Sequence, residues 1–212
     1  TPAVTPGTGG SCVSVSNALG SSVGTVAFWY YARGPWYNYQ PVMDNSAGEN
    51  YWESWIYSDG RLAAAVSTAG GLGTFGAVHP ERTTQWVRDQ IEIVRRATDR
   101  PFGVGFLTPF LRYFEDRFDA VLEASPPVVF LSFGDPEPWL GRAHEAGALV
   151  ICQGQTLEQA RRADAAGADA IVAQGNEAGG HTGTMGLLPL LSAALDACPD
   201  TPMLAAGGVA DG

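Results

Sequence analysis

From about residue 63 onward, short apolar runs alternate with segments of helical period, and this alternation constrains the fold more than any other feature of the sequence. The apolar runs predict strands at 74–78, 102–106, 128–132, 148–152, 170–173 and 203–206. Apolar residues recur at helical spacing between them, which predicts helices at 84–97, 110–122, 136–146, 156–166 and 187–197. Few hairpin signals separate these elements, so the strands are expected to be parallel. The sequence therefore predicts an α/β fold, either a barrel of (βα) units or an open doubly wound sheet.

The first 62 residues have a different composition. They hold 11 of the 22 aromatic residues, whereas 18 of the 22 acidic residues follow them. Residues 1–11 resemble a linker, and β-branched and aromatic runs at 23–31, 39–43 and 51–57 predict strands. We therefore expect a short antiparallel β segment over 1–62, a domain boundary near residue 62, and the α/β unit over 63–212.

Charge and composition exclude several classes of function. Hydrophobic residues make up 45% and charged residues 16% of the chain, as in a packed globular protein. No apolar run approaches the roughly 20 residues that span a membrane. The net charge is −10 and acidic residues are interspersed among the 12 arginines, which argues against nucleic-acid binding. Three distant cysteines and three scattered histidines predict neither a disulfide framework nor a metal site.

Glycines cluster after several of the predicted elements, at 69–73, 174–183 and 207–208. Glycine lets the backbone approach an anion closely, so these loops are candidates for a phosphate cradle. The alternative is that the loops need glycine only for tight turns. A GxGxxG sequence in the dinucleotide-binding context is not present, which disfavours a dinucleotide fold.

His181 is the strongest candidate for a catalytic residue. It lies in the glycine-rich loop after the strand predicted at 170–173, and the C-terminal ends of strands carry the chemistry in a (βα) barrel. An imidazole there can give or take a proton. The alternative is a loop histidine that bonds only to its own backbone. His79 and His144 are expected to be structural or at the surface.

Several of these segments, taken together, resemble the FMN-dependent nitronate monooxygenases, formerly called 2-nitropropane dioxygenases. The segments are 63–73, 101–106, 129–136, 167–183 and 205–212. The block Gln174-Gly-Asn-Glu-Ala-Gly-Gly-His-Thr-Gly183 is the most specific of them. The resemblance implies a TIM-type barrel with FMN at the C-terminal ends of the strands. Residues 63–212 would supply six of its eight strands, an incomplete barrel lacking the first and last.

The resemblance also implies roles for individual residues. His181 corresponds to the histidine that acts on the substrate's acidic carbon or nitronate. Cofactor-binding residues are expected at Gln153, Gln174, Gly179, Gly180, Gly207 and Gly208. The implied reaction is the FMN-dependent oxidation of a nitronate by O2 to a carbonyl compound and nitrite. The partners would be these small molecules, without nucleic acid or membrane, and the expected location is cytoplasmic. No oligomeric state is predicted.

Two other functions compete with this interpretation. One is a flavin-dependent enoyl reductase of the same superfamily, which would consume NAD(P)H. The other is a non-catalytic carbohydrate- or protein-binding β-module, because residues 1–62 weakly resemble a fragment of a laminin-G or concanavalin-like sandwich. Its aromatic residues would stack on sugars or fill a sandwich core; they are Trp36, Tyr37, Tyr39 and Trp52. We also hypothesise that the chain is a fragment or joins two unrelated sequences near residue 62. We therefore expect it to bind FMN weakly and turn over poorly.

Overall fold

The computed structural model describes the backbone of residues 4–6 and 13–15 and, in full, residues 60–78, 82–178, 181 and 183–209. Strands β1 (Val4–Pro6) and β2 (Val13–Val15) pair in antiparallel fashion. Strand β1 lies inside the segment that the sequence predicts to be a linker. The strands predicted at 23–31, 39–43 and 51–57 lie outside the described residues.

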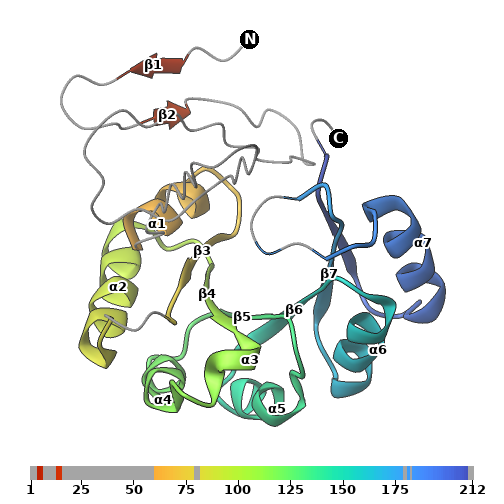
Figure 1. Cartoon of the computed structure of the whole chain (residues 1–212). Coiled ribbons are helices and arrows are strands. Elements are labelled where there is room, and N and C mark those ends of the chain that lie inside the picture. The colour runs from red at the N-terminus through yellow and green to blue at the C-terminus, as the bar shows by residue number, and fades with distance from the viewer. Residues whose placement is uncertain are drawn as a thin grey trace, which may run out of the picture.

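Six parallel strands form the main sheet, and each strand's neighbour in space is also its neighbour in the chain. An open doubly wound sheet would reverse its strand order partway across, whereas a barrel keeps sequential order. The order therefore shows a partial TIM-type barrel, and Figure 1 shows the strands as an open arc. The strands are β3 (Gly73–Gly76), β4 (Phe102–Leu107), β5 (Val128–Ser132), β6 (Leu149–Gly154), β7 (Ala170–Gln174) and β8 (Met203–Ala206).

Helices cover the convex side of this arc and leave its concave side facing inward (Figure 1). They are α1 (Gly60–Thr68), α2 (Thr84–Ala97), α4 (Glu115–Glu123), α5 (Glu137–Glu145), α6 (Leu157–Ala166) and α7 (Leu187–Ala197). The short α3 (Thr108–Leu111) directly follows β4 at the C-terminal edge of the sheet. The core lies between strands and helices. Phe118 of α4 packs edge-on against Phe106 of β4 and Trp139 of α5, with ring centroids 5.2 Å and 5.4 Å apart.

Helix α2 has the bounds that the sequence predicts, because local signals and apolar spacing agree there. Val87, Ile91 and Val94 are buried on one face. The Thr83 hydroxyl accepts a hydrogen bond from the N–H of Trp86 and caps the first turn. Thr156 caps α6 in the same way, and Gly167 ends that helix in a left-handed conformation that glycine adopts at little cost.

The single helix predicted at 110–122 is wrong, because the chain forms the short α3 and then the separate α4. Phe114 lies between them with φ −136° and ψ 32°, outside the helical region. Glu115 and Asp116 then occupy the first turn of α4, where negative charge is favourable near the helix N-terminus. Phe110, expected on the buried face, is 52% exposed as a result.

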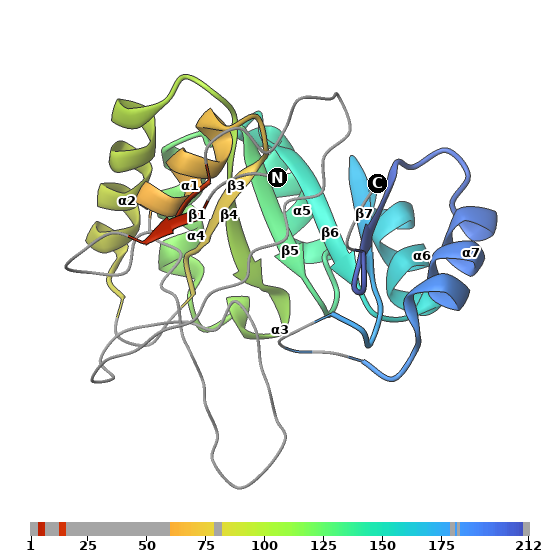
Figure 2. The same ribbon diagram turned by 90° about the horizontal axis from the view of Figure 1, so that it is seen from above.

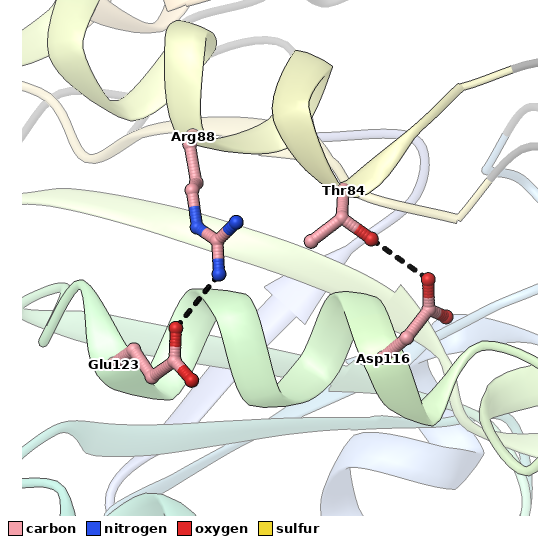
Figure 3. Close-up of polar contacts among 4 residues, drawn as sticks. All are labelled: Thr84, Arg88, Asp116 and Glu123. Atoms are coloured by element: carbon pink, nitrogen blue, oxygen red, sulfur yellow. Dashed lines mark hydrogen bonds and ion pairs between the residues drawn. The ribbon is translucent and has the colours of Figure 1, made fainter.

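Polar contacts join the outer surfaces of α2 and α4. Arg88 forms an ion pair with Glu123 at 2.8 Å, and the Thr84 hydroxyl donates to Asp116 at 2.7 Å (Figure 3). Both contacts are exposed to solvent, so they orient the helices more than they stabilise the fold. None of the helices in the described part of the chain has the length and apolar character needed to cross a bilayer.

Candidate functional site

The C-terminal ends of β5, β6 and β7 bring three polar side chains to one edge of the sheet. The strands run side by side towards this edge, where α3 also lies (Figure 2). Register pairs Ser132, the last residue of β5, with Gln153 of β6. Gln174 is the last residue of β7 and is 3% exposed. The sequence places these residues at strand ends, and the parallel register makes them neighbours.

Hydrogen bonds connect these side chains into one chain that ends at His181. The Ser132 hydroxyl donates to the side-chain carbonyl of Gln153 at 2.7 Å. The Gln153 amide donates to the side-chain carbonyl of Gln174. The Gln174 amide donates to the main-chain carbonyl of His181 at 3.0 Å. Gln155 donates a second bond to the same His181 oxygen. Four side chains thus fix the backbone that carries the imidazole.

The imidazole of His181 is exposed, and an aromatic ring lies beside it. The ring centroids of Phe133 and His181 are 6.4 Å apart, with an angle of 51° between the planes. Phe133 has φ 65°, a left-handed conformation that is rare for a bulky side chain. Its N–H donates to the Gln153 carbonyl at 2.8 Å, which helps to hold this backbone. Such strained residues cluster at functional sites.

The Glu177 side chain bonds the loop that contains His181 to the first turn of helix α7. Both oxygens of its carboxylate accept from the N–H of Leu187, at 2.8 Å and 3.1 Å. Residue Gly186, the N-cap of α7, has no side chain that could cap the helix. The N-terminus of a helix attracts anions, and here a carboxylate from the same chain fills that place.

Gly207 and Gly208 follow β8 with φ values of 122° and 65°. A Cβ at Gly207 would lie 2.8 Å from the N of Ala178, so the two loops meet too closely for any other residue there. Within the described residues, no hydrogen bond is formed by the N–H groups of Gly207 and Gly208. Two N–H groups that have no partner among the described residues, at a strand's C-terminal end, can bind an anion.

The structure therefore brings together Gln153, Gln174 and His181, and it places Gly207 and Gly208 against the loop that contains Glu177. Gly179 and Gly180 lie outside the described residues, as does His79. His144 lies on α5 and bonds to Asp169 at 2.9 Å, away from this edge. No group of three His, Cys, Asp or Glu side chains in the described ranges is arranged to hold a metal ion.

Sequence reasoning missed four residues of this arrangement or gave them no role. Ser132 and Gln155 lie at strand ends, a position that predicts function in a (βα) barrel. Phe133 precedes a glycine but carries no local signal for its left-handed backbone. Glu177 lies ten positions before Leu187, too far along the chain to be recognised as a helix cap.

These residues fit a flavin with a phosphate. The N–H groups of Gly207 and Gly208, which lack a partner among the described residues, could bond to the phosphate. A Cβ at Gly76, the last residue of β3, would meet nothing within 4 Å. The N-terminus of α7 is taken by Glu177, so among the described residues the candidate anion site at this edge is the pair Gly207 and Gly208.

Comparison with known proteins identifies relatives over this part of the chain. The sequence model of the family described as nitronate monooxygenase matches residues 52–212. A probable nitronate monooxygenase of Staphylococcus aureus is 32% identical, covering 72% of this chain and 55% of that protein. A second relative is 35% identical, covering 81% of this chain and 46% of that protein; it is the (3aS,4S,5R,7aS)-5-hydroxy-7a-methyl-1-oxo-octahydro-1H-indene-4-carboxyl-CoA dehydrogenase of Mycobacterium tuberculosis.

Solved structures give a similar result. FabK from Thermotoga maritima is 35% identical with a TM-score of 0.67, covering 74% of this chain and 49% of that one. A nitroalkane oxidase from Streptomyces ansochromogenes is 34% identical with a TM-score of 0.65, and the match covers 72% of this chain and 56% of that one. The chain thus spans about half the length of the relatives it matches.

Proposed function

The chain belongs to the nitronate monooxygenase family, a family of flavin oxidoreductases. From this premise we propose that it is part of an enzyme that uses FMN and O2 to oxidise a nitronate to a carbonyl compound and nitrite. The proposed partners are these small molecules. A cytoplasmic location is part of the proposal and rests on the family resemblance alone.

One observation supports this function above the others: His181 is anchored at the C-terminal edge of the sheet with its imidazole exposed. Two side-chain amides hold its carbonyl oxygen, and Phe133 lies beside its ring. A nitronate is the anion formed when a nitroalkane loses a proton from carbon. An exposed and fixed imidazole is suited to hold that proton or to bond to the anion.

We propose that FMN binds across the same edge. Gly207 and Gly208 would bond to its phosphate through their N–H groups, with Gly179 and Gly180 beside its ring. Gln153 and Gln174 would contact the ring. Each of these amides already uses one donor and one acceptor within the chain that leads to His181. Each keeps one further N–H, so a contact with the cofactor is compatible with that chain.

In the proposed mechanism, FMN held at this edge would supply the redox chemistry that moves electrons from the nitronate to O2. The protein's own residues bind and orient the substrate. His181 holds or moves the proton at the carbon next to the nitro group, and Phe133 forms an apolar wall beside it. Ser132, Gln153 and Gln174 keep the imidazole in place without contacting the reacting carbon.

The test is turnover of propionate-3-nitronate by the FMN-loaded chain, followed by nitrite formation and O2 consumption. We expect slow but measurable turnover, because the chain spans about half of its relatives. His181→Ala should lower kcat by about 10²-fold or more, with FMN still bound. Turnover by His181→Ala at the native rate would contradict the proposal.

A second enzymatic function is oxidation or reduction of a thioester, including the enoyl reductase reaction. It is favoured by the 35% identical relative that is named as a carboxyl-CoA dehydrogenase. An enoyl reductase would consume NAD(P)H with an enoyl thioester. Dependence of turnover on NAD(P)H, without activity on nitronate alone, would support this function over the first.

We also propose the division of the chain into a β-rich segment, 1–62, and an FMN-binding barrel unit, 63–212. A carbohydrate- or protein-binding role for 1–62 is the alternative that the aromatic residues leave open. Glycan binding that survives in the presence of saturating FMN, and is lost in Trp36→Ala, would support that role. Absence of binding across a glycan panel would count against it.

A further inference from the structure

We propose that Gln174 is a positioning residue, which fixes the main chain of His181 through a directed chain of hydrogen bonds from Ser132 and Gln153. This inference deepens the proposed function and rests on it, since it matters only if His181 acts on substrate. It assigns Gln153 and Gln174 a role beyond bordering the cofactor.

The direction of the chain follows from the donors and acceptors along it. A hydroxyl proton from Ser132 goes to the Gln153 carbonyl, so the NH2 group of Gln153 faces Gln174. The Gln174 carbonyl accepts from it, so the NH2 group of Gln174 faces the His181 oxygen. Reversing one amide would set two NH2 groups or two carbonyl oxygens against each other. Each link therefore orients the next.

The burial of these side chains makes each hydrogen bond in the chain hard to replace by water. Gln174 is 3% exposed, and Gln153 and Ser132 are half-buried, so water does not readily replace a lost partner. The imidazole, by contrast, is exposed, and among the described residues Phe133 is its one ring contact. The position of the imidazole therefore depends on how firmly its own backbone is held, and among the described residues the Gln174 and Gln155 side chains bond to that backbone directly.

Isosteric substitutions distinguish a residue that positions His181 from one that only contacts the cofactor. Gln174→Glu keeps the size of the side chain but replaces the donor to His181 with an oxygen. Gln153→Glu removes the donor to Gln174 in the same way. Gln159→Glu is the matched control: it adds the same charge near the end of β6 but keeps the acceptor for the Gln155 N–H, now bonded at 2.7 Å. Ser132→Ala removes only the first donor, three hydrogen bonds away from His181, and serves if the glutamate variants do not fold.

The first measurement is NMR of the whole chain labelled with ¹³C-histidine and free of cofactor, with the His181 signal assigned from His181→Ala. We expect Gln174→Glu to move this signal towards its position in the unfolded chain, Gln153→Glu and Ser132→Ala to move it less, and Gln159→Glu to leave it unchanged. A His181 signal in Gln174→Glu that matches the native chain would overturn the proposal.

The second measurement is made on the FMN-loaded chain. At saturating FMN, Gln174→Glu should lower kcat for a nitronate by about 10- to 100-fold, with KM for the nitronate within about threefold of native. A weakened Kd for FMN with an unchanged His181 signal would overturn the proposal and make Gln174 a cofactor contact alone. If the native chain itself oxidises no nitronate, the proposed function fails, while the NMR result still decides the positioning role.

Discussion

Glu177 illustrates how one side chain can substitute for a missing local signal. Helix α7 begins after Gly186 without a capping side chain, and the Glu177 carboxylate supplies the acceptors from the preceding loop. Gly175 allows this approach, because a Cβ there would lie 2.3 Å from a carboxylate oxygen of Glu177. The same contact ties the loop of His181 to the helix.

Glu177→Ala should therefore lower the free energy of unfolding by about 1 kcal/mol, the usual loss when a helix cap is removed. Glu177→Gln keeps one acceptor and should lose less. Urea denaturation followed by circular dichroism measures both. An alanine variant as stable as the native chain would show that the cap contributes nothing.

Asp169 forms a contact at the opposite end of the barrel that predicts a pH dependence. Its carboxylate accepts from the N–H of Val150 at 2.7 Å and bonds to His144 at 2.9 Å. Partial burial opposes ionisation, but these hydrogen bonds and the charge of His144 outweigh it and lower the pKa of Asp169 below its usual 3.8. A lowered pKa stabilises the fold above the ordinary value and loses that contribution as the pH falls through the folded value.

Asp169→Asn should therefore be less stable than the native chain near neutral pH, and the difference should shrink as the pH falls below about 4. Thermal unfolding of both proteins from about pH 7 to about pH 3 measures this difference. A gap that stays constant over the whole range would mean that the charge of Asp169 does not stabilise the fold.

Cys152 is buried within β6 and should be unreactive. Burial, with the charge of Asp169, raises the pKa of its thiol to about 12, so almost no thiolate forms near neutral pH. In a Cys12→Ser, Cys198→Ala background, which leaves Cys152 as the single thiol, we expect a maleimide to label Cys152 only after unfolding. Rapid labelling of Cys152 in the folded chain would contradict the burial described here.

At the scale of elements, two phenylalanines from the segment predicted as one helix now have opposite environments. Phe118 of α4 is fully buried between Phe106 and Trp139, whereas Phe110 of α3 is 52% exposed. Phe118→Ala should cost about 3–5 kcal/mol, while Phe110→Ala should cost less than about 1 kcal/mol. Urea denaturation of the two variants compares them directly, and equal losses would contradict the difference in burial between the two side chains.

The polar contacts between α2 and α4 should matter far less than this core. Arg88→Ala breaks an ion pair whose side chains are 45% and 66% exposed, and exposed pairs contribute less than about 1 kcal/mol (Figure 3). The same denaturation experiment tests this expectation. A loss as large as that of Phe118→Ala would mean that the pair is shielded from water.

Sequence patterns predicted the elements better than the contacts between them. The helix at 84–97 has the predicted bounds because its apolar residues keep one period throughout. The segment at 110–122 kept that period too, but the acidic residues Glu115 and Asp116 favour a new helix start within it. Periodicity alone does not contain that second signal.

At the scale of the whole molecule, strand order and register determine the site. The sequence predicts that Gln153, Gln174 and His181 each follow a parallel strand, and barrel geometry brings such residues to one edge. The chain of hydrogen bonds could not be predicted, because it depends on Ser132 pairing with Gln153 across two strands. A shift of one residue in that register would turn one side chain away from the other.

FMN binding at this edge is tested by a fluorescence titration of FMN with the native chain, Gly207→Ala and Gly141→Ala. Gly207 has φ 122°, and a Cβ there would lie 2.8 Å from Ala178; Gly141 lies on α5 with no atom within 4 Å of a Cβ. We predict weak but saturable binding by the native chain and Gly141→Ala, and a Kd at least about tenfold higher for Gly207→Ala. No saturable binding by the native chain, or native affinity in a folded Gly207→Ala, would contradict the account.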